Sequence, residues 1–145
     1  MKLGLWVTAH HPADASIAQR YGDLVEQVRL AKRLSFGLIS SGQHYLTAPN
    51  QRLQTFPLLA RLSAEAEGME VATSVLLLPL HNPVDIAEQA ATMDVMTGGR
   101  FILGLGLGNV DLEYQAFGVD KRHRGARFEE SLEIMTLLWR GGPVE

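Results

Sequence analysis

Four apolar segments of strand length begin at intervals of about thirty residues along this chain. They begin near Leu3, Leu38, Val71 and Phe101. An interval of this size is what one strand and the crossover to the next parallel strand require. No antiparallel hairpin fits between them, so the sequence predicts four consecutive βα units and an α/β fold with a parallel sheet.

Apolar residues recur at helical spacing between these strands, as at Leu24, Val28 and Ala31. Residues that commonly start and stop helices stand at the ends of these segments. We expect a first helix that ends at Gly37, a second capped by Thr55 and ended by Gly68, a third capped by Asn82 and ended by Gly98, and a last over residues 125–140. Strands and helices therefore alternate over the whole chain.

Two architectures fit this alternation. One is an open, doubly wound sheet, and the other is the first half of a (β/α)8 TIM barrel, whose complete form needs about 250 residues. In either case residues 1–145 form a single domain that is long enough to bury a core.

Composition and charge exclude several classes of protein. The chain has no cysteine, so it carries neither a disulfide scaffold nor a cysteine-ligated zinc site. Its formal net charge is −3 and its basic residues are scattered, which argues against a nucleic-acid partner. The apolar stretch at residues 3–7 is too short for a signal peptide or a membrane span. We expect a cytoplasmic protein with no membrane partner.

Histidines follow three of the four predicted strands. His10 and His11 follow the first, His44 follows the second and His81 follows the third. The carboxyl ends of parallel strands meet at one edge, where active sites form, and imidazole suits proton transfer near neutral pH. Each of these histidines, taken singly, is also compatible with a solvated loop. We expect no metal site, because neither an HExxH motif nor a carboxylate cluster accompanies them.

Gly104, Gly106 and Gly108 alternate at the end of the fourth strand. A dinucleotide-binding fingerprint would need a further glycine where Asn109 stands and a helix that opens at once, so we reject that interpretation. Glycines at a strand end let a neighbouring backbone, or the flat face of a ligand, come close. The pattern favours a planar cofactor over a phosphate loop.

Six segments carry a family resemblance: residues 77–83, 87–94, 98–101, 103–108, 116–119 and 124–130. Their order and spacing resemble the bacterial luciferase-like family of flavin-dependent oxidoreductases. The resemblance implies a (β/α)8 barrel that binds FMN, or the related deazaflavin coenzyme F420, at its carboxyl face. It covers nearly the whole chain and favours the half-barrel, because members of the family are much longer.

The resemblance also assigns roles to single residues. His44 corresponds to the family's histidine beside the flavin ring and is the implied catalytic residue. Gly42 and Gln43 stand where relatives carry an acidic residue and its neighbour. Ser74 and Val75 match the place where many relatives have a non-proline cis peptide bond against the ring.

Further positions complete the implied site. Gly106, Gly108 and Asn109 match the exit of the fourth strand that lines the edge of the flavin. Relatives often read Gly-Tyr-Arg where this chain has Gly108, Asn109 and Val110. We expect His10 and His11 on the substrate side.

We expect from the resemblance a monooxygenase that oxygenates a small organic substrate with reduced FMN and dioxygen, with a flavin reductase as a possible partner. Two alternatives remain: an F420-dependent enzyme that transfers a hydride, and a non-catalytic half-barrel or assembly module. A half-barrel leaves strand edges and one sheet face open. We therefore expect a truncated piece of a longer product, inactive alone, or a half that pairs with another half in a homo-oligomer or a second chain.

Overall fold

The computed structural model describes residues 2–141, in which four parallel strands form one sheet. The strands are β1 (Gly4–Trp6), β3 (Leu38–Ser41), β5 (Glu70–Leu77) and β6 (Phe101–Gly106). Their order across the sheet, β1-β3-β5-β6, follows their order along the chain. A doubly wound sheet reverses its strand order at a switch point, so this sheet has the winding of a barrel and confirms the predicted half-barrel.

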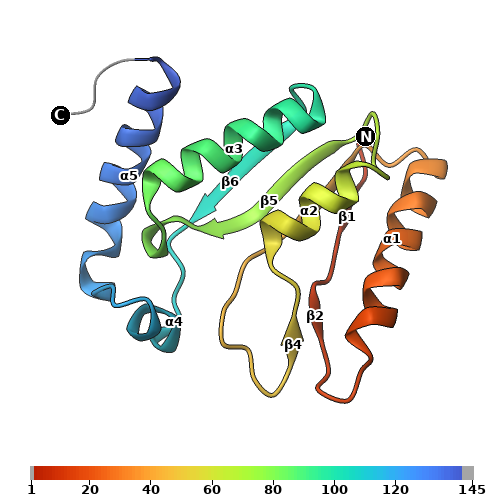
Figure 1. The fold of residues 1–145 in the computed structure, drawn as a ribbon, viewed down its shortest axis with the longest axis horizontal. Helices are drawn as coiled ribbons and strands as arrows, with labels where there is room; N and C mark the ends of the chain where they lie inside the picture. The colour runs from red at the N-terminus through yellow and green to blue at the C-terminus, as the bar shows by residue number, and fades with distance from the viewer. Residues whose placement is uncertain (1, 142–145) are drawn as a thin grey trace.

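Helices connect the strands and cover one face of the sheet. They are α1 (Ile17–Arg33), α2 (Thr55–Ser63), α3 (Pro83–Thr97) and α5 (Arg124–Trp139). Figure 1 shows α2 and α3 crossing in front of the sheet, with α1 and α5 flanking it. Right-handed crossovers place successive helices on the same face when the strand order does not reverse. The result is an arc of strands with its helices on one side.

Register neighbours form rows of side chains that face the helices or face away from them. Ile39 pairs with Leu5 and Val71 in the row that faces the helices, where Ile39 and Val71 are 0% and 1% exposed. Successive residues of a strand point to opposite faces, so the next row faces away. Trp6 and Ile102 belong to that row and are 60% and 45% exposed. The core therefore lies between the sheet and the helices, and residues 2–141 leave the other face open.

Local signals predicted the ends of α3 and α5 well. The Asn82 side chain accepts a hydrogen bond from the Val84 N–H at 2.9 Å, and Gly98 ends α3 in the left-handed conformation, with φ 62°. Helix α5 runs from Arg124 to Trp139, one residue earlier at each end than the predicted 125–140. The caps of α3 are confirmed because they depend only on residues next to each other in the sequence.

Three predicted helix ends are wrong. Helix α1 ends at Arg33, short of Gly37, because Ser35 turns the chain with φ 61°. Helix α2 ends at Ser63, whereas Gly68 lies in the turn before β5 with φ 87°. Thr55 does not cap α2, because its hydroxyl donates to the carbonyl oxygen of Gly42 at 2.8 Å. The first of these ends depends on a non-glycine residue in a conformation that glycine usually takes, and the start of α2 depends on a contact with the loop after β3.

The sequence patterns also missed several short elements. They are β2 (His10–His11), β4 (Gln51–Arg52), α4 (Asp111–Ala116) and two 3-10 turns at Leu78–Leu80 and Lys121–His123. Strands β2 and β4 pair antiparallel as a separate two-residue ribbon beyond the carboxyl ends of β1 and β3. Elements this short carry no periodic pattern, yet β4 and α4 supply important side chains at the site.

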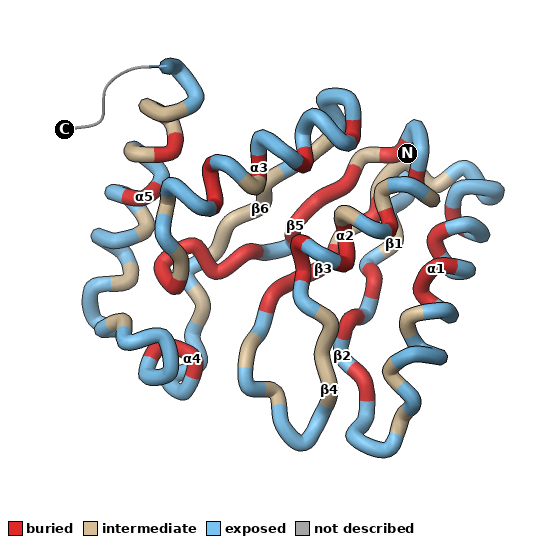
Figure 2. The backbone as a smooth tube through the Cα atoms, viewed as in Figure 1, coloured by how far each residue is buried: buried red, intermediate tan, exposed pale blue. Residues whose placement is uncertain are grey.

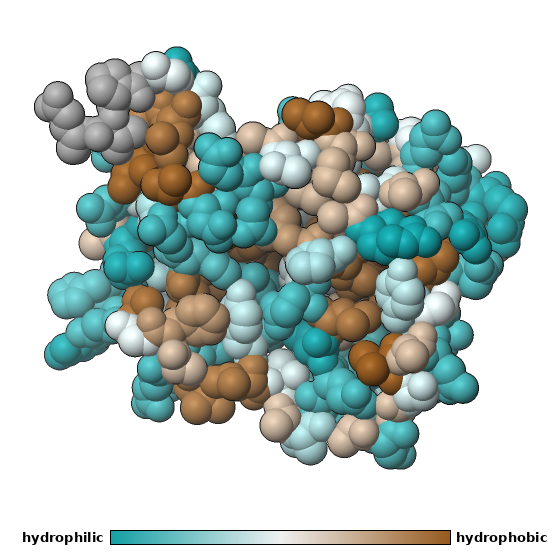
Figure 3. Space-filling view, in the orientation of Figure 1, coloured by the Kyte–Doolittle hydropathy of each residue, from teal (hydrophilic) through white to brown (hydrophobic). Residues whose placement is uncertain are grey.

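The outer surface of α5 stays partly apolar. Figure 3 shows hydrophobic side chains gathered near the C-terminal end of this helix, and Leu132 and Trp139 are 40% and 49% exposed.

Within residues 2–141, no helix combines the length and the apolar run that crossing a bilayer requires. No group of three or more His, Asp or Glu side chains in the same residues is arranged to hold a metal ion.

Candidate active site

The middle of β5 is the centre of the candidate site. The Ser74–Val75 peptide bond is cis, as the family resemblance predicted. Pairing between β5 and β6 shifts register between Thr73 and Leu76, and Figure 2 shows an exposed stretch interrupting the buried strand there. Val75 is 39% exposed, whereas Leu76 is fully buried. The Ser74–Val75 segment thus reaches the surface in the second half of β5.

Two glycines, Gly42 directly after β3 and Gly106 at the end of β6, let the chain pack closely around this segment. A Cβ atom at Gly42 would lie 2.7 Å from the carbonyl oxygen of Ser74, and one at Gly106 would lie 2.4 Å from Cγ2 of Val75. Real Cβ atoms do not approach other atoms so closely, so a side chain at either position would displace its neighbour. The Gln43 N–H donates to the Val75 carbonyl at 3.0 Å. The buried Gly42 and the partly exposed Gly106 therefore pack against the exposed Ser74–Val75 pair, and we call these four residues the glycine-framed platform.

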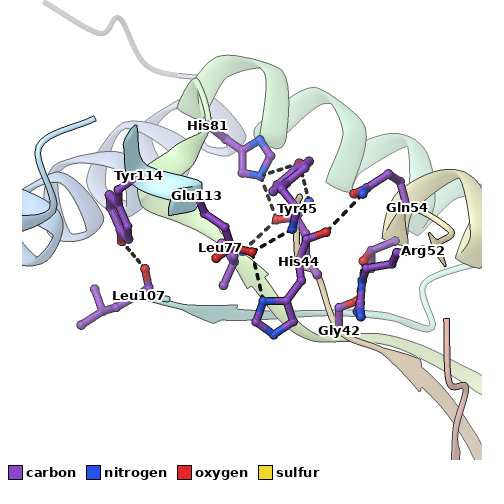
Figure 4. Close-up of polar contacts among 12 residues, drawn as sticks. Gly42, His44, Tyr45, Arg52, Gln54, Leu77, His81, Leu107, Glu113 and Tyr114 are labelled. Carbon is purple, nitrogen blue, oxygen red and sulfur yellow. Dashed lines mark hydrogen bonds and ion pairs between the residues drawn. The ribbon is translucent and has the colours of Figure 1, made fainter. Parts of the chain in front are cut away.

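His44 lies beside this platform and is held by a carboxylate from a distant part of the chain. Its Nδ1 lies 3.0 Å from Oε1 of Glu113, and the same oxygen accepts the N–H of Tyr45 at 2.8 Å. Figure 4 shows Glu113 reaching from α4 to both groups. Glu113 is 1% exposed, and the His44 side chain is 47% exposed. A carboxylate accepts but does not donate, so Nδ1 of His44 carries the proton in this contact.

The second carboxylate oxygen of Glu113, Oε2, is buried and has no hydrogen-bond partner among residues 2–141. A buried carboxylate costs free energy unless its oxygens are satisfied. The other oxygen, Oε1, fixes the position of the His44 imidazole through its contact with Nδ1. Nε2 of His44 is then the ring nitrogen left for other partners.

A second network joins the loop after β3 to the end of β5. Oε1 of Gln43 accepts from the Leu77 N–H at 3.0 Å and from Nε2 of His81 at 2.8 Å, and its amide donates to the Tyr45 hydroxyl at 2.9 Å. An amide oxygen only accepts, so Nε2 of His81 carries the proton. Burial lowers the pKa of His81 and raises that of Tyr45, with the Glu113 carboxylate adding to the latter. Both groups are therefore kept neutral, and the network positions the loop that carries His44.

The β2–β4 ribbon separates the two histidines expected on the substrate side. His11 is 8% exposed and lines a depression together with Arg20 and Asp23 of α1. Burial lowers its pKa, and the Arg20 charge acts in the same direction. His10 points to the other face of the ribbon, because adjacent strand residues alternate, and is exposed.

Arg52 lies directly across the ribbon from His10. It is partly buried, and its Nη2 donates to the carbonyl oxygen of Gly42, as Figure 4 shows. Burial lowers the pKa of Arg52, and the Glu113 carboxylate opposes that change. Arg52 therefore links the ribbon to the carboxyl end of β3.

The structure brings together some of the residues that the sequence singled out. Val75, which follows Ser74, packs against Gly106, and Gly108 lies next to Leu77, from whose Cδ2 a Cβ at Gly108 would be 3.3 Å. Asn109 is exposed after β6, and its carbonyl accepts from Nζ of Lys121 at 2.6 Å. His11 is turned toward α1 and lies apart from the other residues.

Two residues of the site, Glu113 and Arg52, were missed. Neither belongs to a motif, and nothing in the sequence indicates that Glu113 is buried. The one signal that could have indicated Glu113 was its position in the sequence. Glu113 closely follows the fourth strand, and segments in that position lie at the carboxyl edge of the sheet.

The sequence of this chain is similar to a known family and to several characterised proteins. The luciferase-like monooxygenase family matches the chain over residues 1–145. The oxygenase component of a flavin-dependent trigonelline monooxygenase from Acinetobacter baylyi is 26% identical over 148 residues, covering 97% of this chain and 40% of that protein. An F420-dependent glucose-6-phosphate dehydrogenase from Nocardia farcinica is 36% identical over 92 residues, covering 60% of this chain and 27% of that protein.

A solved structure shares the fold at lower identity. The oxygenating constituent of 3,6-diketocamphane monooxygenase from Pseudomonas putida, determined in complex with FMN, has a TM-score of 0.89 and 20% identity. The match covers 99% of this chain and 41% of that one. The chain thus spans well under half the length of the proteins that it matches.

Proposed function

Because the chain belongs to the luciferase-like monooxygenase family, we propose that it forms the flavin-contacting part of a flavin-dependent monooxygenase. The observation that carries this proposal is the glycine-framed platform. Ser74 and Val75 are exposed in an otherwise mostly buried strand, and Gly42 and Gly106 keep other side chains away from them. An exposed, partly apolar segment of this kind, with glycines beside it, fits the face of a planar tricyclic ring.

The residues around the platform fit such a cofactor. Ser74 and Val75 would support one face of the ring, and Gly106, Gly108 and Asn109 would line its edge. When bound, the reduced flavin would supply the electrons with which dioxygen oxygenates a small organic substrate, since the cofactor carries the redox chemistry in such enzymes. FMN is the proposed cofactor, because a relative of this chain is flavin-dependent.

We assign His44 the proton-handling role. Glu113 holds the proton on Nδ1, so Nε2 is the nitrogen that accepts a proton from, or returns one to, a group above the platform. The half-exposed ring leaves that nitrogen room for a partner. His10 would face the substrate, whereas His11 lies on the opposite face of the ribbon.

An F420-dependent hydride transfer is the second candidate function. It is favoured by the relative that is 36% identical over 92 residues and is named for that coenzyme. The two coenzymes have similar planar rings, so the platform suits both. A flavin reductase would be a partner only of the monooxygenase.

Titration of the purified protein with FMN and with F420, followed by flavin fluorescence, tests the proposal. We expect saturable binding of one coenzyme that the change Gly106→Val weakens, because the new side chain would displace Val75. The control is Gly22→Ala in α1, where an added Cβ meets no atom within 4 Å. Binding of neither coenzyme would favour a non-catalytic assembly module. Sedimentation velocity, run in parallel, reports whether the protein pairs with a second copy.

A further inference from the structure

Arg52 is a cation without an ion-paired carboxylate among residues 2–141. Its Nη2 donates to the Gly42 carbonyl, and its Nε is buried with no hydrogen-bond partner in the same part of the chain. A partly buried guanidinium is costly unless an anion or several acceptors compensate it. The side chain is thus held in place by the backbone, and the Glu113 carboxylate acts on its charge without forming an ion pair.

The β2–β4 ribbon places His10 on the same face as Arg52. The two residues are directly opposed in the antiparallel register, and opposed Cβ atoms lie about 5 Å apart on one face. The other face is occupied, because the Gln51 amide donates to the carbonyl of Ala15 at 2.8 Å, and His11 lies against α1. His10 and Arg52 therefore project together toward the carboxyl edge of the main sheet.

Further contacts place Arg52 beside the loop that carries His44. Arg52 is bonded to the carbonyl of Gly42, two residues before His44, and the Gln54 amide donates to the carbonyl of His44 itself at 3.2 Å. Figure 4 shows Gln54 reaching the backbone of His44, and Arg52 next to Gly42. A ligand group bound by Arg52 would accordingly lie next to the imidazole and the platform.

We propose that His10 and Arg52 form an oxyanion site that binds the carboxylate of an organic-acid substrate beside the flavin. This inference deepens the proposed function and rests on it. A guanidinium offers two parallel N–H donors to a carboxylate, and such charge-assisted bonds are strong. The imidazole of His10 supplies a third donor from the opposite strand. Anchoring the anionic end of a substrate here would direct its remaining atoms toward His44.

The test is an NMR titration of the full protein with benzoate, with its uncharged analogue benzamide and with inorganic phosphate. We expect benzoate to bind saturably and benzamide not to bind. The change Arg52→Met should weaken benzoate binding roughly tenfold or more, and His10→Gln should weaken it less. Arg33→Met, which alters an exposed arginine at the end of α1, should leave it unchanged. Equal binding of benzoate by Arg52→Met would overturn the proposal.

Two further measurements keep the result decisive. Arg52→Lys retains the charge but loses the planar guanidinium, so we expect it to bind benzoate less tightly than the unmodified protein and more tightly than Arg52→Met. If Arg52→Met does not fold, weaker benzoate binding by Arg52→Lys supports the proposal, and unchanged binding overturns it. FMN and riboflavin are titrated in the same samples. Weaker binding of FMN alone in Arg52→Met would mean that the site serves the phosphate of the cofactor and would refute the substrate assignment. Loss of benzoate binding with normal flavin binding supports it, and failure of flavin binding in the unmodified protein contradicts the proposed function instead.

Discussion

Oε1 of Glu113 lies 3.0 Å from Nδ1 of His44, although the two residues are 69 positions apart in the chain. Glu113 also accepts the N–H of Tyr45 at 2.8 Å, so a single buried oxygen fixes both the ring and the backbone of the loop after β3. Gly42 and Gln43 precede His44, at the position where the family resemblance implies an acidic residue. A carboxylate from α4 stands beside His44 instead.

The change Glu113→Gln should keep the geometry and remove the charge that selects the His44 tautomer. We expect the unmodified protein to hold the neutral His44 proton on Nδ1, and the variant to show a mixture of the two tautomers. The ¹⁵N chemical shifts of the ring nitrogens above about pH 8 distinguish these states. Glu113→Ala should also lower the free energy of unfolding by about 1–3 kcal/mol, because the Tyr45 N–H loses its acceptor. Identical ring shifts in Glu113→Gln would argue against this role.

Replacement of His44 by alanine should slow turnover far more than it weakens flavin binding. Loss of a positioned proton donor or acceptor costs about 10²–10⁴-fold in rate, whereas the platform does not depend on the imidazole. Steady-state turnover and flavin titration of the complete enzyme measure the two effects separately. His123→Ala, which removes an exposed histidine before α5, is the control. Unchanged turnover in His44→Ala would remove this residue from the mechanism.

The change Gly106→Ala should perturb the platform without unfolding the protein. The new methyl group would lie 2.4 Å from Cγ2 of Val75, so the valine must shift, at a cost of about 1 kcal/mol. Gly22→Ala should instead raise the free energy of unfolding by about 0.5–1 kcal/mol, because Gly22 lies within α1 with open space around it. Urea denaturation compares the two variants. Equal stabilities would show that the contact with Val75 is unimportant.

Acid should destabilise the protein through its buried histidines. Burial lowers the pKa of His81 and of His11 below the ordinary value of 6.5. Below about pH 6.5 the unfolded chain therefore binds protons that the folded chain does not, and the free energy of unfolding falls as pH falls. Above that pH these two groups contribute no pH dependence.

Urea denaturation between about pH 7.5 and pH 5.5 measures this loss. The change His81→Gln should reduce the slope, since the glutamine amide can still donate to Oε1 of Gln43 but does not titrate. His123→Gln, at an exposed position, is the control variant. A profile that is as steep in His81→Gln as in the unmodified protein would exclude His81 as a source.

The main sheet and the platform could be predicted because their signals are local or carried by a family pattern. Asn82 and Gly98 mark the ends of α3 through bonds to near neighbours, and the cis bond at Ser74 falls where the resemblance placed it. The end of α1 could not be predicted, since Ser35 takes the conformation that Gly37 was expected to take. Local propensity is overridden there by the path that the chain takes into β3.

Sequence patterns could not predict which residues hold the site's histidines in place. Glu113 meets His44, and Arg52 meets His10, only after the sheet has formed. The ribbon and α4 are too short to show periodicity. Buried polar contacts between distant segments depend on tertiary packing, so a single sequence predicts the presence of such side chains but not their partners.

The contact between Glu113 and His44 would report on experiments in which the chain is expressed as two fragments. Expressing the chain as two pieces, cut in any loop from residue 46 to residue 110, would put the imidazole and its carboxylate on separate polypeptides. Reassembly of the pieces would then be reported by the ring nitrogens of His44 itself, which serve as a built-in sensor of correct complementation.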